Sequence, residues 1–186
     1  KTGMPVDDVL GGGVGLGKLS VIGGAHEDVS SVLVHAALRL SEQCPVLYMP
    51  IREREEGAIA RLIRAEMGTK VPEDSEERQV EAIRATMRLK QRNLGIFVED
   101  NMTMDLLTSW LLGDQTWNRA VLENIVVVID GLEMLDDNRP INAVLRDLRN
   151  MLSPTSAILV GCFAAEGRED DAEFAEAHCN ADALVR

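Results

Sequence analysis

Short apolar runs rich in β-branched residues alternate along the chain with segments in which apolar residues recur every three or four positions. Runs of the first kind predict β-strands, and segments of the second kind predict amphipathic helices. The run at residues 125–129 is apolar at every position, which is typical of a strand covered on both faces. The predicted strands are residues 19–22, 45–49, 95–98, 125–129, 157–161 and 183–185, and the predicted helices are residues 30–40, 59–67, 74–87, 103–112 and 138–152.

The alternation of strands and helices indicates the architecture. Strand–helix–strand units form parallel sheets with helices on both faces, so we expect a single α/β domain over residues 1–186. In such sheets, ligands bind beyond the carboxyl ends of the strands. Functional residues are therefore expected in the loops at residues 23–31, 50–56, 99–103, 130–139 and 162–171.

Composition and charge narrow the classes of function. The chain has 186 residues, of which 46% are hydrophobic, so it can bury a sizeable core. A formal net charge of -12 and few aromatic residues (2 Trp, 1 Tyr and 3 Phe) argue against a basic or base-stacking nucleic-acid surface. Cys44, Cys162 and Cys179 lack metal-binding spacing, so we expect reduced thiols, no metal site and a cytoplasmic location. No apolar run approaches the roughly 20 residues of a membrane span.

A glycine-rich stretch near the amino terminus has the spacing of a phosphate loop but the wrong context. Residues 12–18 match GxxxxGK, but Leu19 stands where a magnesium-binding hydroxyl is needed. A phosphate loop follows a strand and opens a helix, so that backbone N–H groups face the phosphate. Because residues 12–18 precede a strand instead, we interpret them as a tight turn that leads into it.

Residues 24–31 stand where a phosphate loop belongs, between a strand and a helix. Gly24 corresponds to the first glycine of GxxxxGK[ST] and Ser31 to its final hydroxyl residue. Val29 replaces the second glycine, and Ser30 replaces the lysine. Val29 resists positive φ, Ser30 has no charge to offer to a phosphate, and the two acidic residues before Val29 repel one.

Four further segments carry motifs in a characteristic order. Residues 2–12 begin with Thr-Gly and end in two glycines, and residues 95–100 form a predicted strand that ends in two acidic residues. Residues 125–135 form an apolar predicted strand followed by Asp-Gly, and residues 181–186 begin with Ala-Asp. In order and spacing, these segments resemble the RecA-like motor domain of DnaB-type replicative DNA helicases over almost the whole chain. The resemblance implies a RecA-like P-loop NTPase fold.

The resemblance also implies where an ATP site would lie. It places Asp130 at the Walker B aspartate and Ser30 at the phosphate-loop lysine. Arg52 aligns with the catalytic glutamate, although a slip of one residue would place Glu53 there, and Phe163 lies near the sensor glutamine. Taken alone, Asp130 is equally compatible with a turn, and Arg52 with a solvated run of charges. The candidate nucleotide-binding residues are Gly24, Ser30, Ser31 and Asp130.

These departures from the family pattern predict a decayed ATP site. We expect a non-hydrolysing binding or scaffold module without a cofactor, acting in DNA replication or a related DNA transaction. Two alternatives stay open because Asp130 and Ser31 are retained. One is an active ATP-dependent DNA helicase module with an atypical phosphate loop, which would need ATP and Mg²⁺. The other is a regulatory nucleotide-binding domain.

The resemblance further implies the class of partner. Motor domains of this family assemble as hexameric rings, so we expect self-association or docking on a related RecA-like ring. For this domain alone we expect weak or no DNA binding, and we expect no membrane association. The sequence begins at Lys1 and stops before the family's last strand and its trans-acting basic finger, so we expect a piece of a longer protein.

Overall fold

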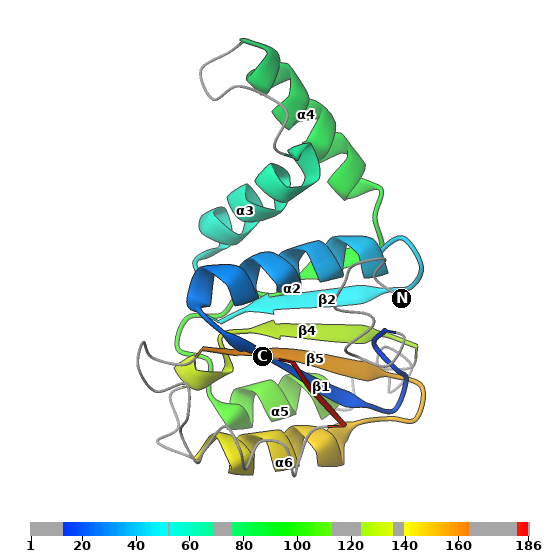
Figure 1. Cartoon of the computed structure of the whole chain (residues 1–186), viewed down its shortest axis with the longest axis vertical. Coiled ribbons are helices and arrows are strands. Elements are labelled where there is room, and N and C mark those ends of the chain that lie inside the picture. Colours follow the sequence, from blue (N-terminus) through cyan, green and yellow to red (C-terminus); the bar gives the residue numbers. More distant parts are fainter. Residues whose placement is uncertain are drawn as a thin grey trace.

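The computed structural model of the protein describes residues 13–51, 53–68, 76–112, 124–135, 140–163 and 182–185. Strands and helices alternate along the chain, as predicted (Figure 1). The strands are β1 (Leu19–Gly24), β2 (Val46–Pro50), β3 (Leu94–Ile96), β4 (Val126–Asp130), β5 (Ala157–Phe163) and β6 (Ala183–Val185). The helices are α2 (His26–Leu40), α3 (Glu55–Met67), α4 (Glu76–Lys90), α5 (Met104–Leu112) and α6 (Ile141–Met151), and a short 3₁₀ helix, η2 (Leu132–Met134), follows β4.

All six strands belong to one sheet, in the order β3-β2-β4-β5-β1-β6. Every neighbouring pair is parallel, so the carboxyl ends of all the strands meet at one edge. The end of β4 lies in the interior of that edge, where Asp130 pairs with Pro50 of β2 and with Gly161 of β5. The predicted α/β fold with a parallel sheet is confirmed.

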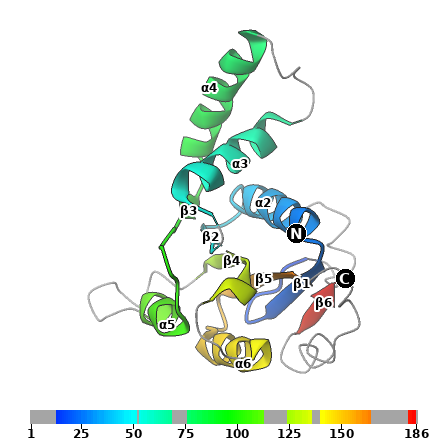
Figure 2. The same ribbon diagram turned by 90° about the vertical axis from the view of Figure 1, so that its left-hand side faces the viewer.

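Helices cover both faces of the sheet (Figures 1 and 2). α2 lies on one face, and α5 and α6 lie on the other. Side chains alternate along β4, so Val128 packs into the cluster under α2, whereas Val127 and Ile129 pack into the cluster under α5 and α6. This burial on both faces explains why β4 is apolar along its length. No helix in the described part of the chain is long and apolar enough to cross a membrane.

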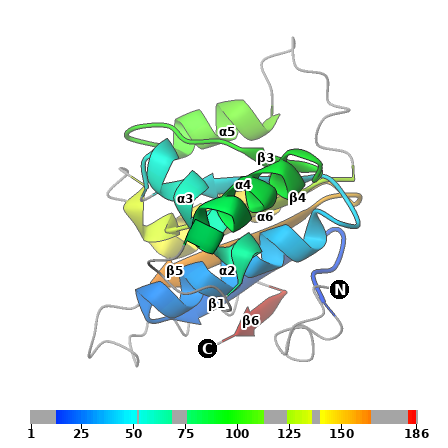
Figure 3. The same cartoon turned by 90° about the horizontal axis from the view of Figure 1, so that it is seen from above.

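A helical hairpin extends away from the sheet on the α2 side. It consists of α3 and α4, which pack against each other, and we call these two helices the α3–α4 arm. The arm is the upper part of the molecule in Figures 1 and 2, and Figure 3 looks down on it. α4 is the outermost helix of the described chain.

Two helices begin four residues earlier than the hydrophobic pattern predicts. α2 starts at His26, and the amide of Val29 already donates a helical hydrogen bond to the carbonyl oxygen of Ala25 at 3.0 Å. α3 starts at Glu55, and acidic side chains fill its first turn, where the helix dipole stabilises them. The first residues of both helices are polar, so the apolar repeat starts only at the end of each first turn, at Val29 and Ala58.

Other boundaries differ less from the prediction. β3 spans three residues rather than the four expected at 95–98. Pro140 stands at the N-cap position of α6, as expected. The predicted helix-capping residues Asp74 and Asn138 lie outside the described residues.

Candidate functional site

Asp130 ends β4 at the interior of the carboxyl edge of the sheet. It is only 5% exposed. A carboxylate buried to this degree needs hydrogen-bond partners, because burying an unpaired charge is costly. The identity of these partners decides what the aspartate can do.

Three side chains from three different elements converge on the Asp130 carboxylate. Ser30 of α2 donates a hydrogen bond from Oγ to Oδ1 at 2.8 Å. Tyr48 of β2 donates a hydrogen bond from Oη to Oδ2 at 2.8 Å. Nη1 of Arg61, on α3, lies 3.9 Å from the same Oδ2. Both carboxylate oxygens therefore have partners within the chain, and one partner is a cation.

Tyr48 is the chain's single tyrosine and is fully buried. Burial, the nearby Asp130 charge and the hydrogen bond to Asp130 all raise the pKa of Tyr48 far above its ordinary value, with burial the largest cause. The phenol therefore keeps its proton at neutral and moderately alkaline pH. It acts as a fixed hydrogen-bond donor to the carboxylate.

Arg61 connects a second carboxylate to this site. Its Nη2 donates a hydrogen bond to Oε1 of Glu53, in the loop after β2. The other oxygen of Glu53, Oε2, is buried and has no hydrogen-bond partner within the described residues. The guanidinium thus lies between two carboxylates and offsets part of their charge. We call this group the Asp130 cluster; its members are Ser30, Tyr48, Glu53, Arg61 and Asp130.

The two alternatives for the catalytic glutamate position have different outcomes. Arg52 lies outside the described residues, so its role stays a prediction. Glu53, which a slip of one residue places at that position, belongs to the Asp130 cluster through Arg61. The end of β2 therefore brings an acidic side chain into the cluster.

The start of α2 determines which serine meets Asp130. The helix turns by about 100° per residue, so neighbouring residues face different directions. Ser30 is buried against Asp130, whereas Ser31 is exposed. Ser30, and not Ser31, therefore supplies the hydroxyl that meets Asp130, whereas the correspondence of either serine to a phosphate-loop residue stays a prediction.

With Ser30 at the hydroxyl position, the phosphate-loop pattern starts at Gly23 and its lysine position falls on Val29. The Val29 side chain is buried in the core under α2. Neither register therefore contains a lysine. Only Ala25 separates the end of β1 at Gly24 from the start of α2, so most of the pattern lies within the helix.

Gly161 of β5 lies beside Asp130 and allows α2 to approach the sheet closely. A Cβ atom at Gly161 would lie 2.4 Å from Cδ1 of Leu33 and 2.8 Å from Cγ1 of Val29. Real Cβ atoms do not approach so closely, so a larger residue would push α2 away from the sheet. The site thus depends on a glycine that the sequence pattern alone did not single out.

Two other predictions concern β1 and its neighbour β5. Phe163 ends β5, where its backbone pairs with Gly24 of β1, and its correspondence to a sensor residue stays a prediction.

At the other end of β1, Gly17 has a φ of +70°, and its N–H donates to the carbonyl oxygen of Ser156 at 2.6 Å. The described part of the glycine-rich stretch is therefore a turn that leads into β1, as predicted.

Among the described residues, neither Cys44 nor Cys162 belongs to the Asp130 cluster. Cys162 is buried within β5, and burial raises the pKa of its thiol well above the ordinary value. Cys179 lies outside the described residues. Within the ranges that the structure describes, no three His, Cys, Asp and Glu side chains form a group that could hold a metal ion.

Comparison with known proteins gives matches in structure but not in sequence. No protein-family model matches the chain, and no curated protein matches it. A solved ATPase domain matches with a TM-score of 0.76 at 16% identity, over 99% of this chain and 74% of that chain. A DnaB-like replicative helicase, described with its interactions with primase, matches with a TM-score of 0.65 at 18% identity, over 86% of this chain and 42% of that chain.

The chain thus spans less than half the length of that helicase. At identities this low, structural likeness is evidence about the fold. The parallel sheet and its flanking helices belong to that shared fold. The chain has the RecA-like fold found in the DnaB-like replicative helicase and in the matching ATPase domain.

Proposed function

We propose that the chain is a helicase-related RecA-fold module that binds protein partners without hydrolysing ATP, in DNA replication or a related DNA transaction. The relation to helicases is supported by the shared fold. The non-hydrolysing role is supported above all by the Asp130 cluster. In it, the chain's own side chains contact both oxygens of Asp130, the carboxylate that the resemblance places at a magnesium-binding aspartate.

The missing phosphate-loop cation supports the same proposal. ATPases with a P-loop use a lysine to hold the β- and γ-phosphates. Here that position falls on Val29 or Ser30, neither of which carries charge. Arg61, the cation of the cluster, is already engaged by Glu53 and Asp130. Electrostatic groups of this kind typically contribute about 3 kcal/mol each to lowering a barrier, so without the lysine hydrolysis should be negligible.

The short connection between β1 and α2 supports it further. A phosphate loop wraps the phosphates with several consecutive backbone N–H groups before its helix begins. In this chain α2 begins at His26, directly after Ala25, and the N–H of Val29 is already used within the helix. The exposed Asp28 in the first turn adds negative charge where a phosphate would lie.

Calorimetry with ATP and Mg²⁺, followed by a phosphate-release assay with single-stranded DNA, tests the proposal. We expect no binding at millimolar nucleotide and no phosphate release above background. Asp130→Asn is the matched control, because it keeps the shape of the side chain and removes its charge. Steady DNA-stimulated release that Asp130→Asn abolishes would contradict the proposal.

A second candidate function requires the chain to bind a nucleotide. It is favoured by the convergence of one hydroxyl and two carboxylates, from Ser30, Glu53 and Asp130, at one edge of the sheet. Oxygen ligands of this kind are those that Mg²⁺ prefers. In the same experiment, binding without hydrolysis would indicate a regulatory nucleotide-binding domain. Binding with DNA-stimulated hydrolysis would indicate an ATP-dependent DNA helicase module.

The proposed partners follow from the fold class, and the proposed location follows from the expectation of reduced thiols. Interactions with primase are described for the DnaB-like helicase. For this chain we propose the broader class, self-association or docking on a RecA-like ring, in the cytoplasm.

A further inference from the structure

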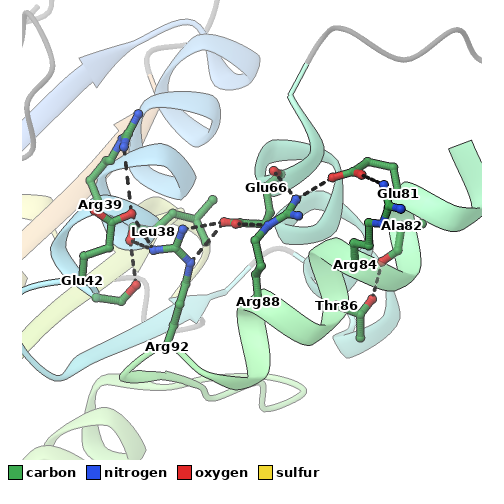
Figure 4. Close-up of polar contacts among 11 residues, drawn as sticks. Leu38, Arg39, Glu42, Glu66, Glu81, Ala82, Arg84, Thr86, Arg88 and Arg92 are labelled. Carbon is green, nitrogen blue, oxygen red and sulfur yellow. Dashed lines mark hydrogen bonds and ion pairs between the residues drawn. The ribbon is translucent and has the colours of Figure 1, made fainter. Parts of the chain in front are cut away.

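A group of ion pairs between half-buried and exposed side chains connects the α3–α4 arm to the core (Figure 4). Glu66 of α3 accepts hydrogen bonds from Nε of Arg88 at 2.9 Å and from Nη2 of Arg92 at 2.7 Å. Nη1 of Arg92 also donates to the carbonyl oxygen of Leu38, on α2, at 2.8 Å and to Glu42 at 2.9 Å. These contacts fix α4 relative to α3 and α2, so the surface of α4 is ordered before any partner arrives.

The inner face of α4 is packed, and its outer face is apolar and uncovered. Ala85 is buried on the inner face, and Leu89 packs against the core cluster under α2. On the outer face, Val80 is 48% exposed, Ile83 is 58% exposed and Met87 is 60% exposed. At 100° per residue these three side chains form one stripe, directly opposite the packed face. An exposed apolar stripe of this kind marks an interaction surface.

The spacing of this stripe is that of a coiled-coil seam. With the charged residues at its two ends, the series is Glu76, Val80, Ile83, Met87 and Lys90. Its intervals alternate between four and three residues, which is the pattern that packs one helix against another. Both end residues are exposed. We call these five residues the α4 seam.

The α4 seam is complementary to itself when one copy is reversed. Ile83 stands at its centre, so in an antiparallel pair Ile83 meets Ile83 of the second copy. Val80 of each copy then meets Met87 of the other, and Glu76 meets Lys90. In a parallel pair, glutamate would instead face glutamate and lysine would face lysine, which is unfavourable.

We propose that the α4 seam is a self-association surface, on which two copies of the chain pair their α4 helices antiparallel. The contact is isologous, since the same surface serves on both copies. Because the arm extends away from the sheet, the two sheets lie at opposite ends of the paired arms (Figure 1). Three apolar residues from each copy bury far less than the 1,200 Å² or so of a stable interface, so the dimer is weak.

Sedimentation of the purified chain over a range from micromolar to millimolar concentration tests the proposal. We expect a monomer–dimer equilibrium that Ile83→Glu weakens by about tenfold or more, because the substitution places two charges at the centre of the seam. Leu16→Glu is the matched control, since Leu16 is 60% exposed and lies outside the arm, and it should leave the equilibrium unchanged. The proposal would be overturned if the chain stays monomeric over the whole concentration range, or if Ile83→Glu leaves the monomer–dimer equilibrium unchanged.

A charge exchange and a cross-link test the antiparallel orientation. Glu76→Lys and Lys90→Glu should each weaken the dimer, and the double variant should restore it. A carbodiimide, which joins carboxylates to lysines in direct contact, should link Glu76 of one copy to Lys90 of the other. Mixing ¹⁵N-labelled and unlabelled chains identifies this link as intermolecular by mass spectrometry. A dimer without the link, or a double variant that fails to recover, would overturn the orientation. The sedimentation, charge-exchange and cross-linking results do not depend on whether the Asp130 cluster binds nucleotide.

Discussion

Tyr48 and Asp130 satisfy each other's polar groups inside the sheet, where neither could be buried alone. The phenol donates to the carboxylate at 2.8 Å, and Ser30 and Arg61 complete the set of partners. A hydrogen bond to a charged group contributes about 1.5–3 kcal/mol, and its loss leaves the carboxylate partly unsatisfied. At the scale of single residues, the hydrogen bonds that stabilise the buried Asp130 carboxylate therefore also determine which of its oxygens could bind a ligand.

Tyr48→Phe should change how stability depends on pH. The pKa of Tyr48 is raised in the folded state, so above pH 10 the unfolded chain loses this proton while the folded chain retains it. The folded state then binds more protons, and the free energy of unfolding falls by about 1.4 kcal/mol per pH unit as pH rises. Urea unfolding between neutral pH and about pH 11 should show a shallower fall in the variant. If the free energy of unfolding falls equally steeply with pH in both proteins, the raised pKa of Tyr48 is contradicted.

Gly161→Ala should destabilise the protein, because the new Cβ would meet Leu33 and Val29 inside the core. Overpacking of this kind costs about 1–3 kcal/mol. Gly57→Ala is the control, since a Cβ in that position on α3 would come no closer than 3.8 Å to Glu53. Replacing glycine within a helix stabilises it by about 0.5–1 kcal/mol. Chemical denaturation should therefore move the two midpoints in opposite directions.

Charged side chains act together with a few apolar contacts to hold the α3–α4 arm in place. Only Ala85 of α4 is fully buried among its described side chains. Leu89 packs against the core cluster under α2, and Arg88 and Arg92 add pairs with Glu66, whose side chain is largely covered. At the scale of elements, the arm is a unit whose position depends on a few ionic and apolar contacts.

Arg92→Ala should loosen the arm more than the sheet. It leaves Glu66 with one fewer partner and removes the link to Leu38, and breaking a largely buried pair in this way costs about 3 kcal/mol. Hydrogen exchange should accelerate at the amides of α4 and stay slow in β4. Arg84→Ala removes an exposed pair with Glu81 and is the control, with little expected change. Uniform acceleration in both elements would argue that the arm does not unfold by itself.

The whole molecule is acidic, with a formal net charge of -12. Binding to nucleic acid depends mainly on neutralising phosphates with Lys and Arg. Several of the arginines form pairs with glutamates, including Arg61, Arg88 and Arg92. The charge of the molecule as a whole therefore opposes contact with DNA.

The isolated chain should bind single-stranded DNA weakly or not at all at physiological salt. The negative net charge of the chain repels the phosphates of DNA. Fluorescence anisotropy with a labelled oligonucleotide measures the affinity, and lowering the salt concentration provides the control for residual electrostatic contact. Submicromolar affinity at physiological salt would overturn this expectation.

The sequence by itself determined the elements and the fold class. Runs of β-branched residues identified all six strands, because local chain geometry and burial select those residue types. The alternation with helices then predicted a parallel sheet, since only crossover connections join parallel strands. Asp130 was identified as a candidate through the resemblance to the DnaB-type motor domain, which places it at the Walker B aspartate after an apolar strand.

The tertiary structure alone decided which side chains meet Asp130. Tyr48 and Arg61 were not singled out in the sequence, because their contacts depend on the strand order that places β2 beside β4. The one available signal was a lone tyrosine in an apolar strand, whose hydroxyl needs a partner when buried. Ser30 rather than Ser31 meets Asp130 because the side chain of Ser30 lies on the buried side of α2, whereas Ser31 is exposed. Local pattern fixes the elements, whereas contacts between residues distant in sequence require the packed chain.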